Sequence, residues 1–158
     1  MQANARLGLF RHFFFADFVD TSALAKAYLN EPASERFRAF FRQQVMPPAI
    51  NTLTILELRR LLGRRCRAGD IDRSEEQLVV AALEQQIQVG LLTVCALEDS
   101  HARAAIDLLA ELRAHSLRAL DALHLAIARE LKAQTLATSD GRMAEAAGSL
   151  GFTVQLFV

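Results

Sequence analysis

Short apolar segments alternate along this chain with longer segments in which apolar residues recur every three or four positions. The short segments predict β-strands, and the longer ones predict amphipathic helices. We expect strands at 14–19, 48–51, 91–97, 135–138 and 152–157. Helices are expected between them, at 21–29, 34–45, 52–68, 74–89, 99–115, 117–133 and 141–151.

Strands that alternate with helices are typical of an α/β fold, so we predict a central parallel β-sheet flanked by α-helices on both faces. The sequence has no internal repeat, low-complexity tract or linker that would divide it. We therefore expect one domain over 14–158. Residues 1–13 are expected to form a poorly ordered N-terminal extension, as chain termini often do.

Composition fits a single globular domain without a strong overall charge. The 158 residues are 52% hydrophobic, and 18 basic and 18 acidic side chains give a formal net charge of zero. The overall field therefore attracts neither nucleic acid nor a membrane, and a polyanion would have to bind a local patch. Cys66 and Cys95 lack the spacing of a metal or redox motif, so we interpret them as small core residues in a reducing compartment.

The apolar N-terminus does not predict a membrane anchor. Arg11, His12 and Asp17 interrupt it before the roughly 18 uncharged residues that a membrane helix needs. No small-residue cleavage site of a signal peptide follows it. We expect a cytoplasmic protein that does not associate with membranes.

Two aspartates stand where a predicted strand meets a predicted helix. Asp20 follows the first strand, and Asp140 follows the strand at 135–138. Each could simply cap its helix, because Asp accepts hydrogen bonds from the free N–H groups of a helix start. Alternatively, both belong to a site at the carboxyl edge of the sheet, where open α/β sheets bind their ligands.

Glu57 and Asp121 are two further acids near the same edge. Both lie early in predicted helices, and each could be an ordinary exposed acid. Taken together, however, four acids at strand ends and helix starts are the oxygen ligands that Mg²⁺ or Mn²⁺ prefers. The four histidines are scattered, which argues against zinc. We interpret His124 mainly as a structural residue, with a role behind the acidic site as the alternative.

Four segments in the same order resemble a known family. They are FVDTSALAKAYLNEPASE, LTILELRR, LRALDALHLAIA and LATSDGRMAEAAGSLG. The chain resembles the PIN-domain nucleases, and most closely the VapC-type toxins of bacterial toxin–antitoxin pairs. The resemblance implies a PIN fold, a Mg²⁺- or Mn²⁺-dependent endoribonuclease, a cognate VapB-like antitoxin and a homodimer.

Carried over by position, the resemblance assigns the acidic site to Asp20, Glu57, Asp121 and Asp140. It also implies polar neighbours of the metal or of its waters, which are Thr21, Ser22, Asn51, Thr138 and Ser139. The chain departs from the family at Asn51, where relatives often carry Ser or Thr, and in its longer N-terminal segment.

An RNA substrate requires cations near these acids. Candidates for phosphate contact follow Glu57 along the chain: Arg59, Arg60, Arg64, Arg65 and Arg67. Each of them alone is more typical of a solvated helix face. The phenylalanines at 37, 40 and 41 form a helical stripe that we interpret as core, with a partner's surface as the alternative. Together with Leu24 and Tyr28, however, they should exceed what one small sheet can cover, so we also expect apolar contact with a partner.

Two other functions remain open at this point. The same fold could serve RNA processing without an antitoxin, or act as a catalytically silent binding module. A phosphatase of the haloacid dehalogenase type would need a second Asp two residues after Asp20, where Ser22 stands instead.

Overall fold

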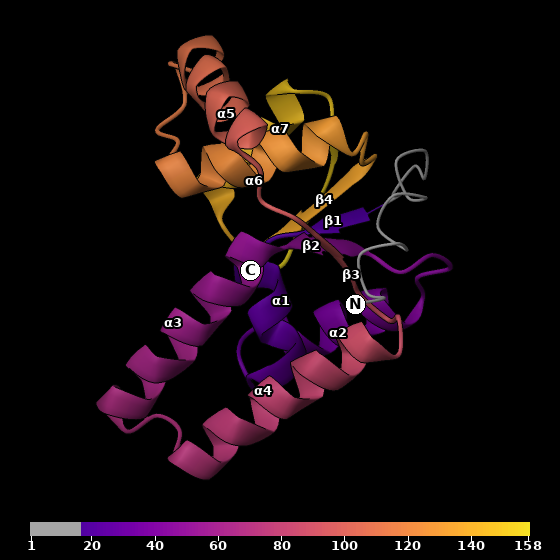
Figure 1. Cartoon of the computed structure of the whole chain (residues 1–158), viewed down its shortest axis with the longest axis vertical. Helices are drawn as coiled ribbons and strands as arrows, with labels where there is room; N and C mark the ends of the chain where they lie inside the picture. Colours follow the sequence, from indigo (N-terminus) through magenta and orange to yellow (C-terminus); the bar gives the residue numbers. More distant parts are fainter. Residues whose placement is uncertain (1–16) are drawn as a thin grey trace, which may run out of the picture.

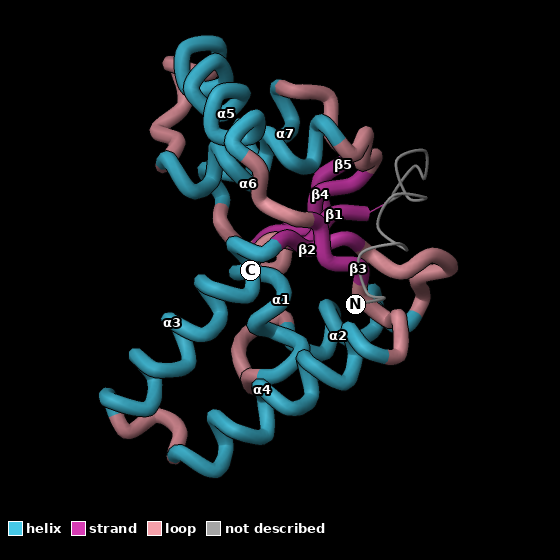
Figure 2. Tube along the Cα trace, in the orientation of Figure 1, coloured by secondary structure: helices cyan, strands magenta, loops and turns pink. Residues whose placement is uncertain are grey.

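The computed structural model describes residues 17–158 as one parallel sheet with helices on both faces (Figures 1 and 2). The strand order is β3 (Thr93–Cys95), β2 (Ala49–Asn51), β1 (Asp17–Val19), β4 (Thr135–Thr138) and β5 (Thr153–Leu156). All four strand pairs are parallel. The α/β prediction is confirmed, and the segment 1–13 that was expected to extend from the domain lies outside the described residues.

The two faces of the sheet are buried by different helices. One face is covered by α1 (Thr21–Tyr28), α2 (Ser34–Arg42), α3 (Thr52–Ala68) and α4 (Arg73–Gln88). The other face is covered by α5 (Asp99–Glu111), α6 (Ala119–Glu130) and α7 (Gly141–Ser149). Figure 2 shows the magenta strands between these two groups of cyan helices.

Neighbouring residues of each strand supply the two cores. In β1, Phe18 packs with α5–α7 whereas Val19 packs with α1–α4. In β4, Leu136 and Ala137 divide in the same way. A strand buried on both faces reads as a short apolar run without alternation, which is the signal that located these segments in the sequence.

The sheet reverses its winding direction between β1 and β4. From β1 the chain adds β2 and then β3 on one side, after which β4 and β5 add on the other side of β1. The helices that follow these two central strands, α1 and α7, lie on opposite faces. Such a switch point opens a crevice outside the carboxyl ends of the strands.

The aromatic side chains of α2 belong to the core. Phe37 is fully buried, and Phe40 and Phe41 are partly buried against the same cluster, where Phe157 also packs. Leu24 is fully buried and Tyr28 is partly buried. The expectation that these five residues form an uncovered apolar surface is therefore wrong, because α2, α4 and the C-terminal segment cover them.

Helix ends follow the signals in the sequence. Gly69 ends α3 in the left-handed conformation at φ 79°, which glycine adopts without steric cost. Asp72 then caps α4 by accepting a hydrogen bond from the Glu75 N–H. The hairpin of α3 and α4 projects away from the sheet in Figure 1. None of the helices in the described part of the chain is both long and apolar enough to cross a bilayer.

Candidate active site

The polar residues predicted at strand ends meet at the switch point. Asp20 directly follows β1, Ser139 and Asp140 directly follow β4, and Asn51 ends β2. The register pairs Val19 with Ala137, which brings Asp20 next to Thr138. The backbone N–H of Asp20 donates to the carbonyl of Ala137 at 3.0 Å.

Asp20 is the most enclosed of the acids, at 4% exposure. Its Oδ1 accepts a hydrogen bond from the Ala23 N–H at 2.9 Å, so it does cap α1. The Ser22 hydroxyl lies 2.9 Å from both carboxylate oxygens, and the Thr138 hydroxyl donates to Oδ2 at 2.9 Å. Capping and site membership are therefore not alternatives for this residue, because one carboxylate does both.

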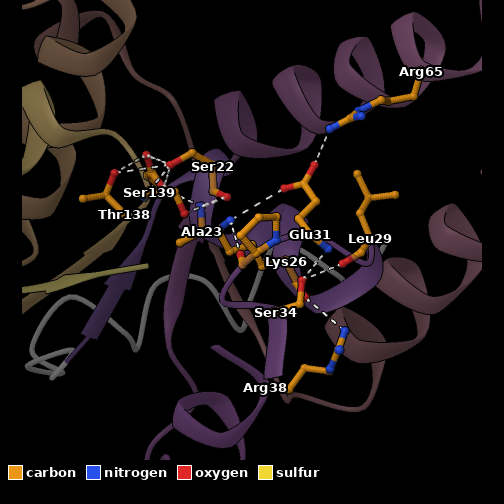
Figure 3. Close-up of polar contacts among 12 residues, drawn as sticks. Ser22, Ala23, Lys26, Leu29, Glu31, Ser34, Arg38, Arg65, Thr138 and Ser139 are labelled. Atoms are coloured by element: carbon orange, nitrogen blue, oxygen red, sulfur yellow. Dashed lines mark hydrogen bonds and ion pairs between the residues drawn. The ribbon is translucent and has the colours of Figure 1, made fainter. Parts of the chain in front are cut away.

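Ser22 ties the ends of β1 and β4 together. The Ser139 N–H donates to the Ser22 hydroxyl at 2.7 Å, and the Ser139 hydroxyl contacts the Ser22 carbonyl at 3.3 Å (Figure 3). The Thr138 hydroxyl also accepts from the Asp140 N–H at 3.0 Å. These bonds fix the direction in which the Asp20 carboxylate points.

Burial raises the pKa of Asp20, and the nearby His124 ring and the hydrogen bonds from Ala23, Ser22 and Thr138 offset this only in part. A buried carboxylate carries its charge at a cost unless an opposite charge lies nearby. The position therefore favours a bound cation.

Asp140 and Asp121 lie near each other, at the starts of two helices. Asp140 caps α7, where its Oδ1 accepts from the Arg142 N–H at 2.9 Å. Asp121 lies in the first turn of α6, and its Oδ2 accepts from the Arg118 N–H at 3.2 Å. Burial raises the pKa of Asp121, and the negative charge of Asp140 raises it further. The two carboxylates thus repel each other, which a shared cation would relieve.

Glu57 belongs to a second hydrogen-bond network. Its Oε2 accepts from the Thr21 hydroxyl at 2.6 Å and lies 2.7 Å from Nε2 of His124. Nδ1 of His124 lies 3.0 Å from Nδ2 of Asn51. Burial of Glu57 acts to raise its pKa, but the hydrogen bonds from His124 and Thr21 outweigh it and lower the pKa. Glu57 is therefore held ionised.

His124 is hydrogen-bonded through both ring nitrogens, which is compatible with the structural role expected for it and with the alternative role behind the acidic site. It is 2% exposed, and it was expected mainly to be structural. Its place three residues after Asp121 on one helix was the available signal. Arg118 and Arg142 were not singled out, although each stands beside an acid of the site: Arg118 precedes α6, and a guanidinium nitrogen of Arg142 lies 3.7 Å from Asp140.

The oxygen donors suit Mg²⁺ or Mn²⁺, which bind carboxylates and water. Within residues 17–158, however, no three His, Cys, Asp or Glu side chains converge tightly enough to enclose an ion. Mg²⁺ is commonly held by only one or two carboxylates while it keeps several waters, so an open cluster still fits this ion. The repulsion between Asp121 and Asp140 and the burial of Asp20 also favour a bound cation.

The arginines proposed for phosphate contact differ in whether their charges are exposed or already paired within the protein. Arg60 lies close enough to Glu57 to lower its pKa, and Arg64 is exposed one turn further along α3. Arg59 and Arg67 are also exposed. In contrast, Arg65 is paired with Glu31, and with Asp70 at 3.0 Å; Figure 3 shows the pair with Glu31. Its charge is therefore engaged within the protein.

Comparison with known proteins relates the chain to one family. Residues 18–149 match the PIN domain. Ribonuclease VapC46 of Mycobacterium tuberculosis is 32% identical over 141 residues, which span 88% of this chain and 95% of the relative.

Two solved structures share the fold. The first is Mycobacterium tuberculosis VapC20, a toxin that cleaves the sarcin–ricin loop. It aligns with a TM-score of 0.66 at 21% identity and covers 86% of this chain and 95% of its own. A toxin–antitoxin complex from Klebsiella pneumoniae aligns with a TM-score of 0.62 at 18% identity, covering 90% and 98%.

Proposed function

Because the chain belongs to the PIN-domain family, we propose that it is a metal-dependent endoribonuclease of the VapC type, the toxin of a toxin–antitoxin pair. The observation that carries the proposal is the placement of Asp20 and Asp140 directly after the two central strands, with Asp20 oriented by two hydroxyls and Asp121 near enough to Asp140 for their charges to interact. The setting for this activity would be the cytoplasm, where RNA is abundant.

We propose that Asp20, Asp121 and Asp140 would hold Mg²⁺ or Mn²⁺, and that Glu57 is the fourth acid of the site. Such an ion, when bound, lowers the pKa of a water and stabilises the leaving oxygen of a phosphodiester. Ser22 and Thr138 keep Asp20 aimed at this point, and Ser139 braces Ser22. Glu57, held ionised by Thr21 and His124, can accept a hydrogen bond from the attacking water.

The RNA backbone requires cations beside this acidic centre. We assign Arg60 and Arg64 to phosphate contact, because they lie three and seven residues after Glu57 on α3 and so share its helix face. The double variant Arg60→Gln with Arg64→Gln should flatten the salt dependence of RNA affinity by about 1.4 log units per log unit of salt, at about 0.7 for each lost phosphate contact to a single strand.

The matched control is Arg73→Gln with Arg113→Gln, which removes two exposed arginines that lie outside α3. Fluorescence anisotropy of a labelled RNA across a salt series measures both slopes. A slope equal to that of the wild type in Arg60→Gln with Arg64→Gln would show that Arg60 and Arg64 do not contact phosphates.

An antitoxin tail has a suitable receptor between the α1–α2 turn and the α3–α4 hairpin. A cavity of about 420 Å³ lies there, and its walls include the apolar side chains Leu29, Ile71 and Leu78 beside Arg65, which is paired with Glu31 and Asp70. It suits a segment that carries apolar side chains, which would fold as it binds.

A homodimer would use a different surface. Ile106 is 67% exposed on α5, and Leu109, one turn later on the same face, is also exposed. This face lies across the sheet from the cavity. We propose that it pairs with a second copy of the chain.

Two single substitutions separate these partners. Leu78→Glu, at a cavity residue that is 67% exposed, should weaken neutralisation by the product of the adjacent upstream gene and leave the dimer intact. Ile106→Glu should do the reverse. Light scattering reports the dimer, and growth during co-expression reports neutralisation. If both variants give the same pattern, the assignment of the two surfaces is wrong.

Induced expression in a bacterial host tests the function itself. The chain should stop growth and leave cleaved RNA, and co-expression of the upstream neighbour should restore growth. Cleavage without any effect of the neighbour would favour an RNA-processing nuclease. A stable, folded chain that leaves RNA uncut would favour a binding module.

A further inference from the structure

The geometry points to a positioning role for two buried residues: we propose that Asn51, through His124, fixes the rotamer and the free oxygen of Glu57. Neither residue is placed among the groups that hold the ion or touch RNA. The inference rests on the proposed function only for its effect on cleavage, because the arrangement of hydrogen bonds can be tested by itself.

The side-chain amide of Asn51 has one possible orientation. Its Oδ1 accepts from the Thr54 N–H at 2.8 Å, which caps α3, so its Nδ2 faces Nδ1 of His124 at 3.0 Å. An amide NH₂ group only donates hydrogen bonds. Nδ1 of His124 is therefore the acceptor and carries no proton.

This assignment sets the tautomer of His124. With Nδ1 bare, the ring proton of the neutral imidazole lies on Nε2 and donates to Oε2 of Glu57 at 2.7 Å. The Asn51 cap at the start of α3 thus determines which ring nitrogen of His124 carries the proton that is donated to Glu57.

Glu57 is fixed as a consequence. Its Oε2 receives two donors, the His124 ring and the Thr21 hydroxyl. Its Oε1 receives no hydrogen bond from the side chains or backbone of residues 17–158. One oxygen therefore anchors the side chain, and the other is presented to water or a cation at the site.

Burial makes this arrangement rigid. Asn51 is fully buried, and His124 is enclosed with the edge of the Phe18 ring against it, at a centroid distance of 6.1 Å. Hydrogen bonds that are shielded from water hold their geometry more strongly than exposed ones. Partners that orient metal-binding groups in this way commonly affect activity by about 10- to 100-fold.

Three proteins test the proposal: the wild type, His124→Gln and His124→Leu. The Gln amide can donate to Glu57 and accept from Asn51, whereas Leu fills much of the same volume without either bond. We expect His124→Leu to lower kcat for a defined RNA by about 10- to 100-fold with an unchanged KM for RNA. His124→Gln should recover most of that loss.

Nitrogen NMR of ¹⁵N-histidine-labelled wild type provides a readout that needs no catalysis. The expected spectrum has a bare Nδ1 and a protonated Nε2 for His124, with the Nε2 proton shifted by its bond to a carboxylate. A protonated Nδ1 would overturn the proposal. So would His124→Leu cleaving within twofold of wild type, or His124→Gln performing no better than Leu.

The two possible failures can be told apart. If wild-type protein does not cleave RNA with Mg²⁺ or Mn²⁺, the proposed function fails, and the NMR spectrum still decides the arrangement of Asn51 and His124. If His124→Leu does not fold, the spectrum of the wild type and the activity of His124→Gln decide. If His124→Gln folds but its RNA cleavage does not exceed the background rate, under conditions where the wild type cleaves, the proposal is contradicted.

Discussion

Asp121→Asn should lower RNA cleavage by more than about a hundredfold while the protein stays folded. Burial raises the pKa of the half-buried Asp121, and the charge of Asp140 raises it further. A cation shared by the two carboxylates would offset both the burial of the charge and the repulsion between them. Metal ions contribute several kcal/mol of transition-state stabilisation in such sites, and each 1.36 kcal/mol is tenfold in rate. The fold should persist because Asn can also accept the Arg118 N–H.

Asp99→Asn is the matched control for this substitution. Asp99 also lies in the first turn of its helix, α5, but its side chain is 82% exposed and, among residues 17–158, its ion pair is with Arg103. The rate of cleavage of a labelled RNA should be unchanged in this control. Equal activity of Asp121→Asn and wild type would remove Asp121 from the site.

Asp20→Asn should abolish cleavage and, in the absence of metal, stabilise the protein. Burial raises the pKa of Asp20 above its ordinary value of 3.8, so the folded state disfavours the charged form. The contribution of this group to stability is therefore present below about pH 3.8 and is lost as pH rises through the raised folded pKa. The advantage of Asp20→Asn over wild type should be absent in acid and grow towards neutral pH.

Thermal melts across pH, with and without Mg²⁺, measure this effect. At 100 times its Kd, Mg²⁺ should stabilise the wild type by about 2.7 kcal/mol, or roughly 5–10 °C, and leave Asp20→Asn unchanged. The control is Asp72→Asn, the same substitution at an exposed helix cap far from the candidate site in the sequence. An Asp20→Asn protein that melts below wild type at every pH would contradict the role given to burial.

Much of the fold could be predicted because its signals are local. Each strand is a short apolar run, and each helix begins or ends at residues such as Asp72 and Gly69 that specify the boundary. The position of the candidate site at the carboxyl edge of the sheet could also be predicted, because Asp20 and Asp140 both come directly after a strand. A parallel sheet brings such positions to one edge.

The rest depends on contacts between distant segments. Residues 51, 57 and 124 meet only once β2, α3 and α6 are packed, so the sequence showed the spacing of His124 from Asp121 but not its contacts with Asn51 and Glu57. Likewise, the pairing of Arg65 with Glu31 joins residues 34 positions apart. The cover that Phe157 gives to Phe37 and Phe40 also comes from the far end of the chain.

The most direct measurement is cleavage of total RNA by the purified protein with Mg²⁺ or Mn²⁺, followed by addition of a chelator and then of excess metal. The central claim is that the acids at the switch point of the sheet cleave RNA by means of a divalent cation. It predicts discrete cleavage products that cease to form with the chelator and form again when metal is restored, with Asp121→Asn inactive throughout. Cleavage that continues in the chelator, or that proceeds equally in Asp121→Asn, would contradict it.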